Sequence, residues 1–509
     1  MNAKYNPRIV AAVMAIAFFV TYMAAYRHVL IFHEQHHLFR FSLDYIRELA
    51  HQKGPWEPAV EFLAQFGYYP RMAALIWSAL LVCVYLMTQS AIRRLTGLRD
   101  YLQLSAVLPC WMFFRTVNID GSLTPVVKAL AIVLAVWLVT RFFRVKAREF
   151  SAIGADRPWK LIAGPLIFGA VFFAFYHYSM RPMTVTLPDG RERAFSRKEV
   201  KLQRANEKLM LQAVQAMRRS DWDEVIDLTN RQALTGTKNH LMSYFRAMAL
   251  YHRGALLDHI FDLPQHHGPR SLFFPWKADK NQAEYGGYLY EQLGALNSAI
   301  HWEFEALVGW GETAHHLINL SRYLIETGRG EQAVKFIAPL KQTLFYRSTA
   351  RQLEQWLADG DVPGLRDALK GVSQTPMRAD NVLNLAGDCR YILNNDPGNE
   401  MAKQYLMMTL LMANNLGAFY RNLPDLYPPD GGKPLPRVFQ EALCLVRLNY
   451  GSDRLAADGY HIDPATDAAY RAFIAEKNKG KFANYSADQK RTYWYYLLNY
   501  SPEGNQINF

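Results

Sequence analysis

The hydrophobic positions of the 509-residue chain are spread unevenly, and the pattern changes near residue 180. Before that point, apolar residues form long runs, and about 20 such residues in a helix cross the hydrocarbon core of a bilayer. After it, apolar and charged residues alternate at the spacing of amphipathic helices. The pattern predicts an all-α protein with an N-terminal membrane domain and a larger C-terminal soluble domain.

Five apolar segments predict about five transmembrane helices within residues 1–180. They cover residues 9–26, 71–89, 102–117, 125–143 and 161–178. The third segment is short and is interrupted by Pro109, so it either spans the bilayer or re-enters from one side. We interpret it as a span.

The basic residues predict how these segments are oriented. Residues 1–180 hold 18 Lys and Arg against 9 Asp and Glu, whereas residues 181–509 hold 39 against 36. If all five segments span the membrane, 11 of these 18 basic residues lie on the same side of the membrane as the N-terminus. Basic loops stay in the cytoplasm, so the N-terminus is expected there and the C-terminal domain outside it. The near-neutral C-terminal domain argues against nucleic-acid binding.

The first outer loop, residues 27–68, contains two amphipathic segments. Apolar residues recur at helical spacing in both, at Phe41, Tyr45 and Leu49 and then at Val60, Leu63 and Phe66. Such helices lie in the headgroup region of a bilayer, so membrane lipid is an expected partner.

The soluble part begins with a predicted β-hairpin at residues 181–195. Ser196 and Glu199 then have the spacing of a capping box, which starts a helix. From residue 196 to 509 the sequence predicts helix–turn–helix units of irregular length. This is typical of a tetratricopeptide-like α-solenoid, which binds protein partners in its concave groove.

The stretch from His33 to His37 raises a catalytic alternative. His33-Glu34-Gln35-His36-His37 fits H-E-x-x-H, in which His33 and His37 would bind zinc and Glu34 would activate water. A zinc peptidase needs a third protein ligand. The candidates for that ligand have no diagnostic spacing, and they are His51, His266, His267, His315 and His316. We therefore predict no metal site and no cofactor, and a zinc-dependent membrane peptidase is the weaker alternative.

The other alternative is a membrane glycosyltransferase-like enzyme that uses a lipid-linked donor. Such enzymes have an acidic catalytic residue in a first outer loop with amphipathic helices, and Asp44 would be that residue. Five spans are fewer than such enzymes usually have. The leading interpretation is a membrane-anchored helical-repeat protein that binds or scaffolds partners and is not an enzyme.

Cys389 and Cys444 are either buried free thiols or a disulfide.

Several stretches resemble an uncharacterised domain-of-unknown-function family of bacterial envelope proteins. They include EQHHLFRFSLDYI, FLAQFGYYPRMAALI, ALYHRGALLDHIFDLPQHHGPRSLF, TGRGEQAVKFIAPLKQTLFYR, NNDPGNEMAKQYLMMTLLMANNL, LPRVFQEAL and TYWYYLL. The resemblance implies an N-terminal multi-pass region, a tetratricopeptide-like C-terminal region, and a bacterial inner-membrane location with a periplasmic C-terminal domain. It also implies that Glu34, Gln35, Leu38 and Phe39 are family features and that the flanking histidines are not. No catalytic residue is carried over.

Overall fold

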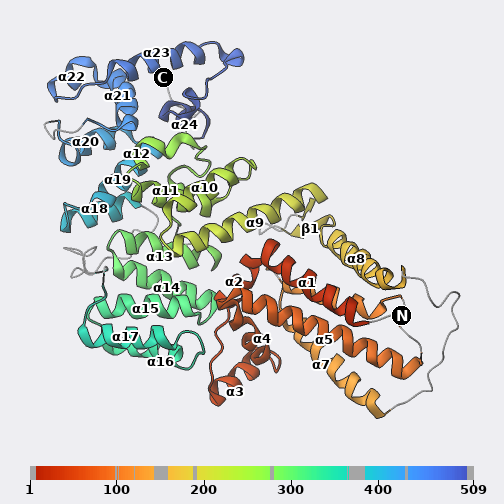
Figure 1. Ribbon diagram of the computed structural model, residues 1–509. Helices are drawn as coiled ribbons and strands as arrows, with labels where there is room; N and C mark the ends of the chain where they lie inside the picture. Colours follow the sequence, from red (N-terminus) through yellow and green to blue (C-terminus); the bar gives the residue numbers. More distant parts are fainter. Residues whose placement is uncertain are drawn as a thin grey trace. The chain divides into compact units, whose positions relative to one another are not determined.

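The computed structural model describes residues 7–97, 100, 102–119, 121–142, 159–186, 192–275, 280–363, 365, 385–429 and 434–500 (Figure 1). Over these residues the secondary structure is helical apart from one two-stranded sheet, so the all-α prediction is confirmed. The chain forms two compact units. The first comprises Met1–Ala205, Glu312–Ile318 and Lys335–Glu354, and the second comprises Asn206–Gly311, Asn319–Val334 and Gln355–Phe509.

The first unit is built on long apolar helices joined by shorter ones. Its described elements are α1 (Pro7–Ala25), α2 (Arg27–Gln35), α3 (Leu43–Gln52), α4 (Glu57–Ala64), η1 (Gln65–Tyr68), α5 (Pro70–Thr96), η2 (Leu104–Ala106), α6 (Val107–Thr116), α7 (Thr124–Val139), η3 (Thr140–Phe142) and α8 (Trp159–Ser179). Helices α3 and α4 match the two amphipathic helices expected in the first outer loop.

The expectation of five spanning helices is wrong. Within the described residues four helices are long and apolar enough to cross a membrane: Pro7–Ala25, Pro70–Thr96, Thr124–Phe142 and Ile162–Ser179. The third expected segment holds the ten-residue α6, preceded by the short 3-10 helix η2. A helix of that length covers about 15 Å, half of a hydrocarbon core of about 30 Å.

Helices α5 and α7 nevertheless run in the same direction (Figure 1). At their starts, the Thr124 hydroxyl donates to Glu57 of α4 at 2.5 Å, and α4 leads through η1 into α5. At their ends, the Arg94 guanidinium lies 5.9 Å from the ring centroid of Trp137. The segment between them therefore returns from the end of α5 to the end of the unit where both helices begin.

Hydrogen bonds hold both ends of this returning segment. The Tyr85 hydroxyl donates to Gln103 at 2.8 Å, partway along α5. Thr116, at the end of α6, meets the Tyr22 hydroxyl at 2.6 Å and accepts a bond from His33 Nε2 through its carbonyl at 3.2 Å. Tyr22, Gln103 and Thr116 are all buried, so these bonds satisfy polar groups that have no access to water.

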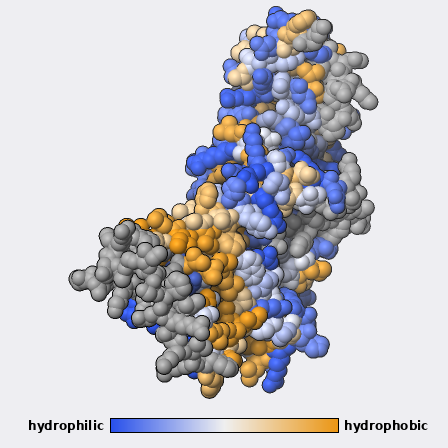
Figure 2. All heavy atoms as spheres, turned by 90° about the vertical axis from the view of Figure 1, so that its right-hand side faces the viewer, coloured by the Kyte–Doolittle hydropathy of each residue, from blue (hydrophilic) through white to orange (hydrophobic). Residues whose placement is uncertain are grey.

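Exposed apolar side chains cover the long helices of this unit, as the hydrophobic area in Figure 2 shows. On α7 and α8 they are Ile132, Leu134, Val136, Leu138, Val139, Ile162, Leu166 and Phe173. Apolar exposure on this scale is unusual for a protein surrounded by water, and it is what a lipid-facing surface requires.

The region of residues 27–68 is held by one close backbone approach. A Cβ atom added to Gly67 in η1 would lie 2.2 Å from the Leu30 carbonyl oxygen of α2. Only glycine therefore lets η1 pack against α2. Next to this contact, Tyr68 stacks on Phe345, with ring centroids 5.2 Å apart, and the Tyr346 hydroxyl donates to the Glu34 carboxylate.

A hairpin and a long helix follow the apolar region. Strands β1 (Met183–Thr186) and β2 (Glu192–Phe195) pair antiparallel, which confirms the expected hairpin, although its turn lies outside the described residues. Helix α9 (Arg197–Arg218) follows. The Ser196 amide donates to Glu199 at 2.8 Å and the Glu199 amide to the Ser196 hydroxyl at 3.3 Å, so the capping box is also confirmed.

The second unit consists of shorter helices that pack largely with their neighbours in sequence. Their bounds are α10 (Trp222–Ala233), α11 (His240–His252), α12 (Leu256–His259), η4 (Ile260–Asp262), η5 (Gly268–Leu272), α13 (Lys280–Gln292), α14 (Leu296–Trp310), α18 (Leu385–Asn395), α19 (Glu400–Met412), α20 (Leu416–Leu426), α21 (Arg437–Tyr450), α22 (Ser452–Ala457), α23 (Pro464–Lys477), η8 (Gly480–Phe482), η9 (Gln489–Arg491) and α24 (Tyr493–Asn499). Helices α15 (Ala314–Glu326), α16 (Gly330–Lys341) and α17 (Arg347–Asp359) contribute residues to both units.

Small residues and side-chain caps define the helix pairs. A Cβ at Gly286 of α13 would lie 2.4 Å from the Trp302 ring of α14, so these helices touch through glycine. Asn239, Asn399 and Asn415 each accept a bond from the amide three residues on and start α11, α19 and α20.

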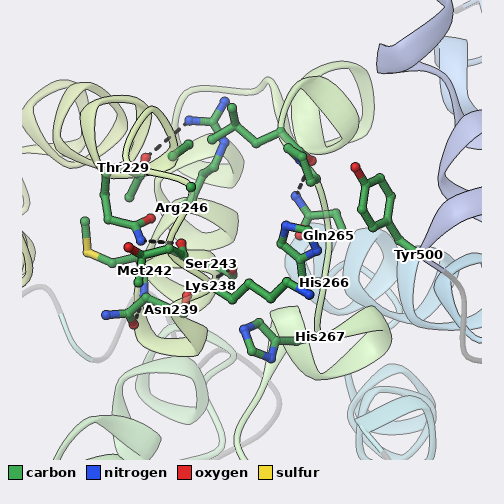
Figure 3. Close-up of a pocket in the computed structure, with 16 residues that line it drawn as sticks. Thr229, Lys238, Asn239, Met242, Ser243, Arg246, Gln265, His266, His267 and Tyr500 are labelled. Atoms are coloured by element: carbon green, nitrogen blue, oxygen red, sulfur yellow. Dashed lines mark hydrogen bonds between the residues drawn. The ribbon is translucent and has the colours of Figure 1, made fainter. Parts of the chain in front are cut away.

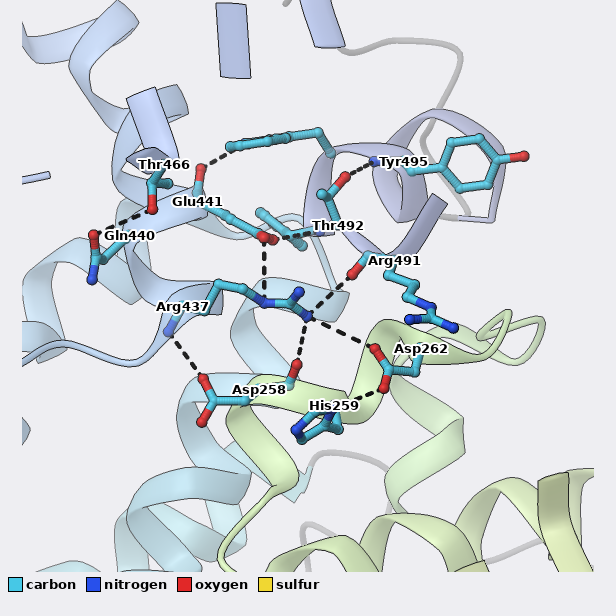
Figure 4. Close-up of polar contacts among 12 residues, drawn as sticks. Asp258, His259, Asp262, Arg437, Gln440, Glu441, Thr466, Arg491, Thr492 and Tyr495 are labelled. Carbon is cyan, nitrogen blue, oxygen red and sulfur yellow. Dashed lines mark hydrogen bonds and ion pairs between the residues drawn. The ribbon is translucent and has the colours of Figure 1, made fainter. Parts of the chain in front are cut away.

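The end of the chain is fastened by a network of polar contacts around Arg437, whose side chain is partly exposed (Figure 4). The Arg437 guanidinium contacts the Asp258 carbonyl, the Arg491 carbonyl at 3.3 Å, the Asp262 carboxylate at 4.0 Å and the Glu441 carboxylate at 3.6 Å. Glu441 is buried and accepts the Tyr493 amide at 2.7 Å, which ties α24 to α21. Burial raises the pKa of Glu441 to about 7, although Arg437 and the Tyr493 amide lower it.

We expect this carboxyl to make the second unit more stable in acid. In the unfolded chain Glu441 would ionise near its ordinary pKa of 4.5, whereas in the folded chain it ionises near pH 7. Its contribution to the free energy of unfolding is therefore complete below pH 4.5 and is lost as the pH rises through about 7. The difference is on the order of 3 kcal/mol. Urea unfolding of the full chain between pH 5 and 8 should show this loss, and Glu441→Gln should flatten it. The exposed Glu331→Gln should keep the wild-type slope, and an equally steep slope in Glu441→Gln would contradict the assignment.

Candidate functional site

A pocket opens in the second unit between α10, the start of α11, and the loop that joins η4 to η5 (Figure 3). Tyr500, next to the end of α24, closes one side. The polar and charged residues that line it are Thr229, Gln232, Thr237, Lys238, Asn239, Ser243, Arg246, Gln265, His266, His267 and Tyr500. Four of these carry or can acquire positive charge, and none of the lining residues is a carboxylate.

Arg246 is the central cation of the pocket. It is only 5% exposed and projects from α11. One of its terminal nitrogens donates to the Thr229 hydroxyl at 3.2 Å and to the Asn230 side-chain oxygen at 2.8 Å. Its Nε has no hydrogen-bond partner in the described part of the chain. Burial lowers the pKa of Arg246 to about 10, partly offset by Asp262, so the guanidinium stays charged at neutral pH.

Two histidines and a lysine line another side of the pocket (Figure 3). Lys238 is exposed and reaches across the pocket toward His266 (Figure 3). His267 stacks on His240, with ring centroids 4.8 Å apart, and its buried Nε2 has no partner among the described residues. Burial, together with the charges of His240, His266, Lys238 and Arg270, lowers the pKa of His267 to about 4. The imidazole is therefore neutral in the empty pocket at neutral pH.

Gln265 supplies a fixed acceptor. Its side chain is 2% exposed, and its Nε2 donates to the Ile260 carbonyl at 2.6 Å and the Leu263 carbonyl at 3.0 Å. These two bonds fix which end of the amide is nitrogen. Oε1 has no partner within the described residues. The pocket therefore combines unpaired donors with one unpaired acceptor.

The residues that the sequence singled out in the first outer loop lie elsewhere, in the first unit. His33 is buried and its Nε2 donates to the Thr116 carbonyl, whereas His37 uses Nδ1 to donate to the His33 carbonyl at 2.6 Å. Burial and the neighbouring His37 lower the pKa of His33 to about 3. Since His33 Nε2 is engaged and the Glu34 carboxylate accepts from Tyr346, the pair does not present two free Nε2 atoms and a free base to one point.

The structure does not bring together the other proposed catalytic or metal-binding groups. In the described residues no three His, Cys, Asp or Glu side chains are grouped to hold a metal ion. His51 lies in α3, and His315 and His316 lie in α15. The Asp44 side chain is 96% exposed and its charged neighbour is Arg47 at 3.8 Å. Cys389 and Cys444 are buried free thiols.

Sequence reasoning saw His266 and His267 only as possible zinc ligands and did not select Lys238, Arg246 or Gln265. Their common feature is burial without a full set of partners, which periodicity does not reveal. One signal was present: the stretch from Leu263 to Arg270 is rich in polar residues and prolines between helical segments.

The fold and pocket define an all-helical protein with four apolar helices in one unit and a basic pocket in the other. The chain belongs to DUF6057, a family of unknown function, whose profile matches residues 3–187 and 166–500. No curated protein and no solved structure matches it significantly.

We expect His33 to stabilise the first unit. His33→Ala removes the bond to Thr116 and leaves a buried cavity, which should lower the free energy of unfolding by about 1–3 kcal/mol. The thermal unfolding midpoint of the full chain in detergent measures this. His36→Ala, whose partner is a carbonyl of its own helix, is the matched control. Metal analysis should find no stoichiometric zinc; one zinc per chain, lost in a His33→Ala/His37→Ala variant, would revive the peptidase alternative.

Proposed function

We propose that the chain is a membrane-anchored binding protein whose second unit takes up a small polar ligand in the basic pocket. The observation that carries the proposal is the convergence of buried polar atoms without partners: Arg246 Nε, Gln265 Oε1 and His267 Nε2. Each such atom costs about 1–3 kcal/mol unless something bonds to it. A ligand that bonds to them recovers that cost, which favours binding at this place.

The lining favours binding over catalysis. It offers no carboxylate or thiol, and the histidine with a buried free nitrogen has a pKa lowered to about 4, below the range of an efficient general base at neutral pH. Helix pairs joined by short turns favour a tetratricopeptide-like solenoid, and such folds also bind protein partners in their grooves. An envelope protein is the partner we propose for that surface.

The membrane part of the proposal rests on the first unit. Four apolar helices cross the bilayer, and the segment with α6 makes a further pass through broken structure, because α5 and α7 run in parallel. Polar groups of this pass at Gln103, Ser105 and Thr116 are bonded inside the protein, which a non-helical crossing requires. With basic loops retained in the cytoplasm, the N-terminus is cytoplasmic and the second unit lies in the periplasm of a bacterial inner-membrane protein.

Alkaline phosphatase fusions test this topology. A fusion after Ser196 should be active, and one after Arg148 inactive, because the enzyme folds only outside the cytoplasm. A third fusion after Asn118 should also be active, since it follows the broken pass. If the segment does not cross, the pattern reverses from that point on: the fusions after Asn118 and Ser196 would be inactive, and the fusion after Arg148 would be active.

Ligand binding is tested on the full chain in detergent. A ligand that fills the pocket should raise the thermal unfolding midpoint in a panel of small polar metabolites, both charged and neutral. Lys238→Ala should abolish the shift, whereas the equally exposed Lys490→Ala should retain it. If no member of the panel raises the midpoint of the wild type, the proposal is wrong.

A further inference from the structure

The class of ligand can be narrowed from the chemistry of the pocket, and this step rests on the proposed binding function. We infer that the pocket binds an oxyanion that carries a hydroxyl group, of the kind that hydrogen phosphate or a singly protonated phosphate monoester presents. Its anionic oxygens meet Arg246 and Lys238, and its hydroxyl donates to Gln265 Oε1.

Charge is the first argument for an anion. A nearly fully buried guanidinium is normally paired with a carboxylate, because an isolated buried charge is costly. The side-chain partners of Arg246 are the neutral oxygens of Thr229 and Asn230, and Asp262 is only a more distant charge. The missing negative charge is therefore expected from a ligand.

The start of α11 adds to this field. The helix has 13 residues and begins at His240, beside Lys238 and Asn239 in the pocket wall. Asn239 caps the Met242 amide at 3.2 Å, and the helix dipole places partial positive charge at this end. Helix starts bind phosphate groups through the same field. Here the buried, unpaired Arg246 Nε is the independent observation that points to a bound anion.

Gln265 decides between oxyanions. Because its Nε2 is held by two carbonyls, its Oε1 is the amide atom left without a partner among the described residues, and it can only accept. An acceptor repels a fully deprotonated oxygen but binds a hydroxyl. Phosphate keeps a hydroxyl at neutral pH and sulfate does not, so the pocket should prefer phosphate to sulfate despite their similar size.

His267 couples binding to protons. The groups facing it are His240, His266, Lys238 and Arg270, all of which can carry positive charge. A bound anion offsets their repulsion and raises the pKa of His267, so the complex takes up a proton. Binding should therefore tighten as the pH falls from 8 toward 6.

The test is isothermal titration of the full detergent-solubilised chain with inorganic phosphate and, separately, with sulfate. We expect phosphate to bind at least about tenfold more tightly, a difference of about 1.4 kcal/mol. Lys238→Ala should weaken phosphate binding by a similar factor, and Lys490→Ala should leave it unchanged. Titration in two buffers of different ionisation enthalpy should show proton uptake on binding.

The outcomes separate this inference from the function on which it rests. Equal affinity for phosphate and sulfate, or no phosphate binding while a neutral metabolite raises the unfolding midpoint, would overturn the inference and leave the binding function standing. No ligand of any class would overturn both. Soluble glycerol phosphate and vesicles containing phosphatidic acid, titrated in parallel, assign the phosphate group to a metabolite or to a lipid headgroup, and either result supports the inference.

Discussion

The return of the chain from the end of α5 to the beginning of α7 is the constraint on which the first unit depends. A membrane helix satisfies its own backbone, but a short helix with irregular residues before it does not. Described bonds meet part of this requirement: the Asp100 carboxylate accepts from the Leu104 and Ser105 amides at 2.9 and 2.8 Å, and the Thr116 carbonyl accepts from His33. Tyr85 fixes Gln103 at one end, and Tyr22 and His33 fix Thr116 at the other. The direction of the chain after α6, and with it the proposed side of the second unit, follows from this return of the chain.

The same constraint explains the H-E-x-x-H stretch. His33 is buried because it bonds to the end of α6, and Glu34 is buried because it accepts from Tyr346 beside the glycine contact of η1 with α2. Both side chains thus join segments distant in sequence. Five residues that match a metal-binding motif in sequence therefore hold segments of the fold together. His33 does not offer Nε2 to a metal here, because that nitrogen donates to the Thr116 carbonyl.

Features with local causes could be predicted from the sequence. The capping box at Ser196, the hairpin before it and the amphipathic helices of the outer loop each follow from residues close together in the chain, and the structure has all of them. Hydropathy could also count apolar segments, but not tell that the segment with Pro109 would form only a ten-residue helix. The pocket could not be foreseen, because its lining comes from α10, α11, the residues near Gln265 and Tyr500, which only the tertiary fold brings together.

Two arginines of the second unit show why the pocket is better read as a binding site than as a structural accident. Arg437 has two carboxylates within 4.0 Å and two carbonyls as hydrogen-bond acceptors, and it fastens the end of the chain, although its Nε, like that of Arg246, has no hydrogen-bond partner in the described part of the chain. Arg246 is less exposed than Arg437, yet it meets only neutral side-chain oxygens and leaves Nε unpaired. The chain therefore places carboxylates around an arginine whose side chain is 41% exposed and leaves the more deeply buried arginine without a carboxylate partner, next to an unpaired acceptor. Burial without partners is costly to the fold alone and becomes favourable once a ligand supplies the missing charge and the missing hydroxyl.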